Sequence, residues 1–214
     1  MYKKITVLMF FLVILITACS PQEPLKTPVP QQSTSQPSPS ATLTPTKPAL
    51  LTLEESAQAV VNALSVRDLE TVAEFVHPER GVRLSPYTYV QDDHQVFLPN
   101  ELPGLAGFAQ VLLWGNYDGS GDPIELTFDE YYARFLYSAD FANPEAMAVN
   151  KELGHSSMIN NIADYYPGSS FVEYHFSGFE EEYGGMDWVS LRLVFIQEDG
   201  VWFLVGLVND RWTI

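Results

Sequence analysis

Hydrophobic and polar positions divide the chain into three regions. The first holds an almost unbroken apolar run from Ile5 to Ile16, which follows Lys3 and Lys4. The second, from residue 20 to about 49, is dense in Pro, Ser, Thr and Gln and almost free of large apolar side chains. From residue 51 onward, apolar positions recur with helical and strand spacing, which predicts a single folded domain. We therefore divide the chain into residues 1–18, 19–50 and 51–214.

The folded region begins with two predicted helices. Thr52 and Glu55 match a capping box, in which a hydroxyl and a carboxylate satisfy two backbone N–H groups at a helix start. Apolar residues then follow at helical spacing as far as Leu64. A second helix is predicted from Asp68, and Pro78 ends it because the residue before a proline avoids helical angles. The two helices form a hairpin with one apolar side.

The last 45 residues show the clearest strand pattern. Residues 171–176 alternate, and residues 187–196 place Trp188, Ser190, Arg192 and Val194 on the face opposite the better apolar one. Glu198-Asp199-Gly200 predicts a hairpin turn. Residues 201–208 are apolar on both faces, as in a doubly covered strand. Helices followed by strands predict an α+β fold, with the helix pair packed on an antiparallel sheet.

The middle of the domain carries weaker signals. Short strands are predicted at 81–84 and 95–98, and a longer one at 110–117 that enters the turn 118–121. Thr127 is placed to cap a helix over 128–136. No element is predicted for residues 141–160.

The order of these elements resembles the nuclear-transport-factor-2-like fold, also called the cystatin-like α+β cone. The resemblance lies in the opening helix pair, 53–76, and the closing strands, 171–208. It implies a curved antiparallel sheet with a pocket between sheet and helices. Some proteins of this fold are isomerases or dehydratases that use an Asp or an Asp–His pair as a base, and many only bind ligands or partners. The fold alone does not choose among these functions.

Cys19, the only cysteine in the chain, follows the apolar run directly. The sequence Ile16-Thr17-Ala18-Cys19 resembles the bacterial lipobox, which implies cleavage before Cys19 and a diacylglycerol on its sulfur. The run is about a dozen residues long, whereas a membrane-spanning helix needs about 20, so we interpret it as a signal peptide. The chain is also similar to uncharacterised bacterial lipoproteins that carry the sequence 77–83 followed by Ser85-Pro86-Tyr87.

The resemblance implies a protein anchored in the cell membrane by its lipid and facing outside the cytoplasm. The Pro-rich segment after Cys19 cannot bury enough apolar surface to offset the entropy of ordering, so we expect a disordered linker. Beyond residue 50 the chain has seven basic and 26 acidic side chains, a net charge of −19. Such a surface repels nucleic-acid phosphates and anionic lipid head groups, which excludes nucleic acid as a partner.

Two groups of residues are candidates for a pocket base. Asp92, Asp93 and His94 form one cluster, where a carboxylate could orient an imidazole, but they lie in a predicted loop and a solvated turn explains them better. Glu173 and His175 share one face of a strand, and a neighbouring strand could bring Arg192 close. That second group would form either a pocket floor or a salt-bridge patch on the surface.

Other features give weaker indications. Asn116, Asp118 and Ser120 are similar to the start of a calcium loop, but Thr127 replaces the closing glutamate, so we predict no metal and no cofactor. Trp188 and Trp202 are candidates for a binding or dimer face. Three functions remain open: binding of an unidentified ligand or envelope protein, which we favour; an isomerase-like or dehydratase-like enzyme; and a structural module that forms a homodimer.

Overall fold

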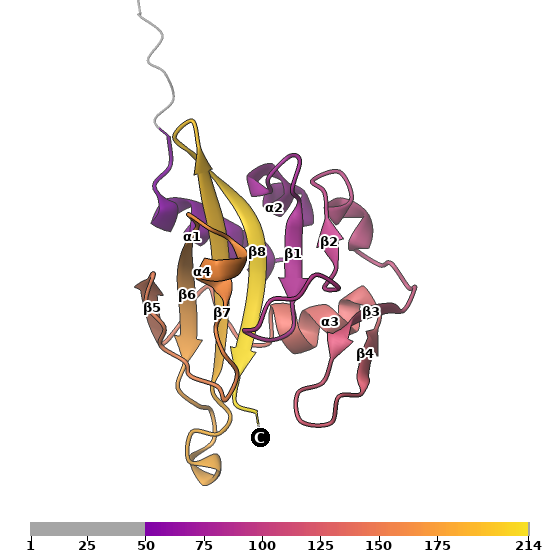
Figure 1. Cartoon of the computed structure of the whole chain (residues 1–214), viewed down its shortest axis with the longest axis vertical. Coiled ribbons are helices and arrows are strands. Elements are labelled where there is room, and N and C mark those ends of the chain that lie inside the picture. The colour runs from indigo at the N-terminus through magenta and orange to yellow at the C-terminus, as the bar shows by residue number, and fades with distance from the viewer. Residues whose placement is uncertain (1–49, 214) are drawn as a thin grey trace, which may run out of the picture. The chain divides into compact units, whose positions relative to one another are not determined.

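The computed structural model describes residues 50–213. Their main element is a curved six-stranded sheet (Figure 1). The strand order is β2-β1-β8-β7-β6-β5, and all neighbours are antiparallel except β1 and β8. The strands are β1 (Val82–Ser85), β2 (Val96–Phe97), β5 (Ala146–Val149), β6 (Ser170–Phe176), β7 (Val189–Glu198) and β8 (Val201–Arg211). The hairpin of β7 and β8 is central, and its turn residues Asp199 and Gly200 have φ angles of 50° and 84°. Positive φ at both positions suits a tight two-residue turn.

Helices cover one face of this sheet. The predicted hairpin is present as α1 (Leu53–Ser65) and α2 (Leu69–Phe75), and α3 (Phe128–Tyr131) continues into a π-helical segment, η2 (Tyr132–Leu136). Thr52 and Thr127 both form capping boxes, with Glu55 and Glu130. The main hydrophobic core lies on this face and contains Val189, Leu191, Leu193 and Phe195 of β7.

A long connection covers the opposite face. Residues 150–169 join β5 to β6 and contain the short helix α4 (Ile162–Tyr165). Figure 1 shows α4 in front of β7 and α1 behind the sheet. Ile162 packs against Val194 and Ile196 of β7 in a second, smaller core. The polar positions of β6 and β7 therefore point toward this connection.

A separate two-stranded sheet extends the molecule beside β1. It consists of β3 (Leu112–Asn116) and β4 (Pro123–Leu126), which pair around the predicted turn. Trp114 of β3 is fully buried and stacks on Tyr131 of α3, with 3.9 Å between the ring centroids. The remaining short elements are η1 (Leu102–Leu105) and η3 (Glu181–Tyr183).

The α+β class is confirmed, and the sheet is antiparallel as predicted except for the pair β1 and β8. β1 pairs in parallel with β8 because a long excursion of the chain, which includes the other strands, separates them. Residues 141–160, for which no element was predicted, contain β5. Within residues 50–213, no helix is long and apolar enough to cross a membrane. The predicted signal peptide, the lipid-bearing Cys19 and the linker up to residue 49 lie outside the described residues.

Candidate functional site

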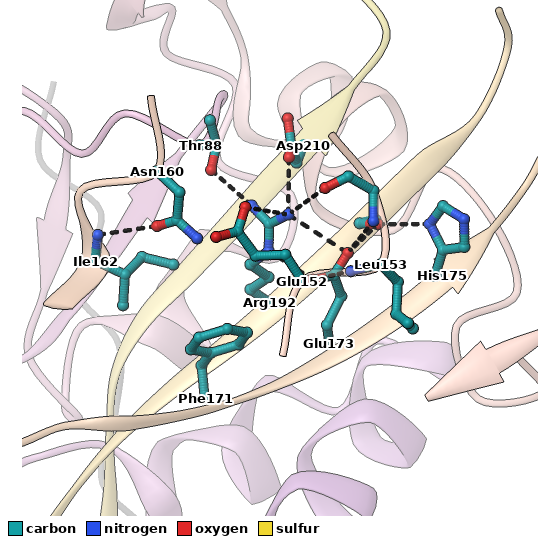
Figure 2. Close-up of polar contacts among 12 residues, drawn as sticks. Thr88, Glu152, Leu153, Asn160, Ile162, Phe171, Glu173, His175, Arg192 and Asp210 are labelled. Carbon is teal, nitrogen blue, oxygen red and sulfur yellow. Dashed lines mark hydrogen bonds and ion pairs between the residues drawn. The ribbon is translucent and has the colours of Figure 1, made fainter. Parts of the chain in front are cut away.

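A buried arginine organises the sheet face beneath the connection (Figure 2). Arg192 of β7 is completely inaccessible to solvent. Its Nε donates to Oε2 of Glu173 at 2.8 Å, and its Nη2 pairs with Oδ2 of Asp210 at 2.8 Å. Its Nη1 donates to Thr88 Oγ1 at 2.6 Å, and Nη2 also donates to the carbonyl of Gly154 at 3.0 Å. One guanidinium thus joins β6, β8, the loop after β1 and the connection.

Glu173 of β6 is as deeply buried as Arg192 and fully engaged. Besides the arginine, its carboxylate accepts hydrogen bonds from Ser190 Oγ at 2.6 Å and from the backbone N–H groups of Gly154 at 2.9 Å and Leu153 at 3.2 Å. Buried charges are tolerated when they are paired and hydrogen-bonded in this way. The lone pairs of this carboxylate are therefore occupied by protein donors.

The two carboxylates around Arg192 respond differently to their surroundings. Burial alone raises the pKa of Glu173, but the Arg192 charge and the hydrogen bonds outweigh it and hold the pKa below the usual range. At Asp210, burial dominates over the arginine and raises the pKa. Burial opposes the charge of Arg192, but Glu173 and Asp210 outweigh it and raise its pKa, so the guanidinium stays charged. The centre is thus a fixed cation with an ionised carboxylate against it.

These charges hold a segment that has no regular secondary structure. Glu152, Leu153 and Gly154 lie across the sheet, and the last two are bonded through their backbone to Glu173 and Arg192. A Cβ atom on Gly154 would lie 2.3 Å from the Trp188 ring, so only glycine allows this close approach. The buried cluster consequently fixes the position of the connection on the sheet.

Surface pockets lie on both sides of that segment. One, of about 290 Å³, is lined by Glu152 and by residues of the connection and β6, namely Asn150, Asn160, Ile162, Ala163, Ser169 and Phe171. The other, of about 160 Å³, is lined by Leu153, Gly154, His155, His175, Ser177 and Trp188. We call them the Asn160 pocket and the His175 pocket. A larger pocket of about 320 Å³ lies beyond Trp188, near Arg211.

The predicted proximity of Glu173, His175 and Arg192 is confirmed, but the two settings predicted for them are both wrong. Glu173 and Arg192 form neither a pocket floor nor a surface patch, because the connection seals them from solvent. His175 is half-buried at the edge of this cluster, and its Nδ1 lies 2.8 Å from Ser190 Oγ. It is the member of the group that reaches a pocket.

The cluster of Asp92, Asp93 and His94 is a turn whose side chains diverge. Asp92 is exposed and accepts a hydrogen bond from Tyr165 at 2.6 Å, and Asp93 is exposed as well. His94 points inward, and its Nδ1 lies 3.0 Å from Ser85 Oγ. Burial lowers the pKa of His94 to about 4. The three residues therefore do not converge on one site.

Trp188 and Trp202 do not share a face, so the single aromatic surface expected of them is absent. Trp188 is buried against Gly154 and faces the ring of His175, with 5.9 Å between the centroids. Trp202 packs against the main core on the helix side, near the opposite end of the β7–β8 hairpin. A β-bulge between Val194 and Phe195 shifts the register of that hairpin.

The sequence analysis did not predict four partners of Arg192: Thr88, Gly154, Asp210 and the more distant Glu152, whose carboxylate lies 3.9 Å from Nη2. Asp210 follows the apolar run of β8, and its polar character at the strand end was the available signal. Thr88 and Gly154 lie in irregular segments, where no periodicity indicates which way a residue points. The serine that links Glu173 to His175 was placed on the correct face with Arg192, but no role was assigned to it.

Comparisons with known proteins leave the family open. No protein-family model matches the chain, and no curated protein matches it. Solved structures that align with it include a protein from Xanthomonas campestris described as a calcium/calmodulin dependent protein kinase II association domain, and a nuclear-transport-factor-2-like protein of unknown function from Shewanella oneidensis. The first is 12% identical over 71% of this chain and 79% of that one, with a TM-score of 0.29. The second is 10% identical over 74% and 95%, also with a TM-score of 0.29. At these TM-scores we base no argument on either.

Proposed function

We propose that this protein is a lipid-anchored, extracytoplasmic binding protein whose domain holds its ligand on the sheet face covered by the connection, without catalysing a reaction. The fold that we propose for the domain is of the nuclear-transport-factor-2-like type. The anchor is the acylated Cys19, as the lipobox resemblance implies, and the Pro-rich segment after it separates the domain from the bilayer.

The buried charges have their hydrogen-bonding positions occupied by protein groups, and this supports a binding role. A catalytic base must reach the proton that it abstracts. Glu173 accepts from Ser190, Gly154, Leu153 and Arg192, so it has no lone pair to offer a substrate. The cluster instead fixes a segment that separates two pockets, which is the supporting role that a preformed binding surface needs.

The Asn160 pocket has the composition of a site for a small polar ligand. Glu152 contributes a half-exposed carboxylate, and Phe171 contributes a ring. The Oδ1 atom of Asn160 accepts a hydrogen bond from the backbone N–H of Ile162 at 3.0 Å. The side-chain NH₂ group of Asn160 is not used in that bond. A few placed polar groups beside an apolar wall are typical of ligand sites. Its volume, about 290 Å³, suits a ligand the size of one sugar or one amino acid.

The proposal is tested by adding a small-molecule extract of the cell envelope to the mature protein in detergent and recording its NMR spectrum. We expect saturable shifts of the amides around Asn160 and Phe171 or around His175, and a weaker response of a Phe171→Ala variant. A Phe179→Ala variant, which changes an exposed ring outside both pockets, should respond as the wild type does. A spectrum unchanged by the extract would contradict the proposal.

The enzymatic alternative now rests on one residue. His175 is the single candidate base that lines a pocket on this face, and it is supported from behind by Ser190 and Glu173. An activity that disappears in a His175→Asn variant with unchanged fold would favour an enzyme over a binding protein.

A further inference from the structure

The hydrogen bonds behind His175 determine which of its ring nitrogens carries a proton. Ser190 has one hydroxyl proton, and at 2.6 Å it donates that proton to the Glu173 carboxylate. An ionised carboxylate can only accept hydrogen bonds. Ser190 Oγ must therefore accept at its other contact, the 2.8 Å hydrogen bond to His175 Nδ1. His175 Nδ1 is consequently the donor of this bond and bears a hydrogen.

The second ring nitrogen is then an acceptor whenever the ring is neutral. A neutral imidazole has one N–H group, so a ring protonated at Nδ1 has a lone pair at Nε2. Nε2 of His175 makes no hydrogen bond to any residue between 50 and 213. Burial lowers the pKa of His175, and Arg192 and His155 act in the same direction against the opposing charges of Glu173 and Glu145.

A second side chain of the pocket wall, Ser177, is also committed as a donor. Ser177 Oγ lies 2.9 and 2.8 Å from the two carboxylate oxygens of Glu145 and donates its proton to them. Its remaining lone pairs can only accept. The carbonyl of Gly154 is already bonded to Arg192. His175 and Ser177 thus present acceptors, and the exposed His155 stands at the rim.

We propose that the His175 pocket is a subsite for an uncharged polyhydroxylated ligand, a saccharide unit, one of whose hydroxyl groups donates to His175 Nε2. This inference names a ligand class for the proposed binding function and rests on it. The chain Glu173–Ser190–His175 is the device that keeps Nε2 an acceptor. These residues orient the ring of His175 and fix its tautomer, and no covalent bond is made or broken.

The alternatives to a hydroxylated ligand fit the pocket less well. An anion would face the lone pair of Nε2 and the repulsion of a domain with a net charge of −19. A purely apolar group would leave Nε2 without a partner, which is costly where water is displaced. A peptide supplies one N–H per residue together with a carbonyl that needs a donor, whereas each hydroxyl can donate. At about 160 Å³ the pocket is smaller than a site that encloses a whole small molecule, so it suits one sugar ring at most.

The tautomer is measured directly by long-range ¹H–¹⁵N correlation spectra of the mature protein at neutral pH. We expect the His175 signals of a ring protonated at Nδ1 and unprotonated at Nε2. In a Ser190→Ala variant, whose Nδ1 loses its acceptor, the signals should move toward the opposite tautomer. A wild-type ring protonated at Nε2 would overturn the inference.

Ligand binding is tested with methyl glucoside, methyl galactoside and N-acetylglucosamine as probes. At least one should shift the His175 and Trp188 side-chain signals saturably. A His175→Asn variant keeps a donor to Ser190 but lacks the acceptor at the Nε2 position, so it should bind about tenfold more weakly. Phe179→Ala, which changes an exposed ring outside this pocket, should bind as the wild type does.

Protonation supplies a further readout. Below the pKa of His175, which lies under its usual range, Nε2 carries a proton and can no longer accept. The hydrogen bond that the probe's hydroxyl donates to Nε2 should therefore be lost as the pH falls through that value. The titratable and charged groups that face the ring are Glu173, Glu145, Arg192 and His155. Glu173 and Glu145 raise the pKa of His175, but burial, Arg192 and His155 lower it, and the net shift is downward.

Several outcomes would overturn the saccharide assignment. One is that no probe shifts His175 even at its highest soluble concentration, and another is that trialanine shifts it while the sugars do not. Sugars that bind only at the Asn160 pocket would also overturn it, although the proposed binding function would then stand. Failure of that function appears separately, as an absence of any response to the envelope extract.

Discussion

At the scale of the residue, the main energetic feature is the buried set of charges around Arg192. Removing two charges from water costs several kcal/mol per ion, and good geometry with full hydrogen bonding roughly offsets that cost. The cluster therefore adds little net stability as a whole, but loss of one member leaves the others buried and uncompensated. Its contribution is to specify where the connection lies.

Replacement of Arg192 by methionine should destabilise the protein strongly. Glu173 would lose its cation, and Asp210 would lose the 2.8 Å ion pair. A broken buried pair costs about 3–5 kcal/mol, measured as the free energy of unfolding in urea. The matched control is Arg67→Met, which removes the exposed 2.7 Å pair with Asp129 and should cost less than about 1 kcal/mol. Equal losses in both variants would show that the buried cluster has no special role.

His94 predicts a specific loss of stability in acid. Its pKa in the folded protein is about 4, below the unfolded value of 6.5, because burial disfavours the charged ring. Below pH 6.5 the unfolded chain binds the proton and the folded chain does not, so stability falls as the pH decreases from 6.5 to about 4. The full loss is about 3 kcal/mol. Across this range, the unfolding free energy should depend less steeply on pH in a His94→Asn variant. The Oδ1 atom of that asparagine can accept a hydrogen bond as Nδ1 does.

If the slope between pH 6.5 and 4 is the same in His94→Asn as in the wild type, the attribution to His94 is wrong. His155→Asn is the control, since the side chain of His155 is 72% exposed and donates nothing to the core.

At the scale of the element, periodic segments were predictable and irregular ones were not. The sequence pattern located α1, α2, the caps at Thr52 and Thr127, and both faces of β7, because each is decided by local spacing. It missed β4, which begins with a proline, and β5, which is four residues long. It also missed α4, whose four residues are too few to show a helical period.

The candidate site was predictable only in part for the same reason. Alternation along β6 and β7 places Glu173 and Arg192 on one face, and their pairing follows from antiparallel register. The sealing of that pair depends on Gly154, which comes from an irregular segment about 20 residues earlier in the chain. No local pattern fixes such a long-range contact, so exposure and burial of the pair could not be distinguished.

Gly154→Ala tests how tightly the connection is held. The added methyl group would overlap the Trp188 ring, 2.3 Å from its Cβ position, and would lie 2.8 Å from Ser190 Oγ. We expect a loss of about 1–3 kcal/mol in unfolding free energy, the usual cost of overpacking, together with a shift in Trp188 fluorescence. Gly104→Ala is the control, since no atom lies within 4 Å of its Cβ position. If Gly154→Ala left the unfolding free energy unchanged, the connection would not be held tightly against the sheet.

At the scale of the whole molecule, charge and anchoring have to be explained together. A domain with a net charge of −19 does not bind an anionic bilayer through its surface. Any stable attachment must then come from acyl chains, and two or more chains bind firmly where one does not. The proposed lipidation of Cys19 meets that requirement.

A Cys19→Ala variant should leave the membrane fraction. We expect wild-type protein to sediment with membranes and to resist release by high salt, because its attachment is hydrophobic. The variant should be soluble after export or should accumulate with its N-terminal extension intact. Wild-type protein whose Cys19 sulfur carries no lipid by mass spectrometry would rule out the anchor.

The proposed binding surface depends on buried charges that hold the connection in place, and amide hydrogen exchange measures this directly. Leu153 and Gly154 lie outside regular secondary structure, yet their N–H groups bond to the buried Glu173 carboxylate. They should exchange as slowly as the amides paired between β6 and β7. Exchange as fast as that of the exposed residues around Gly184 would show that the connection is not held by the cluster, and would contradict the proposed binding surface.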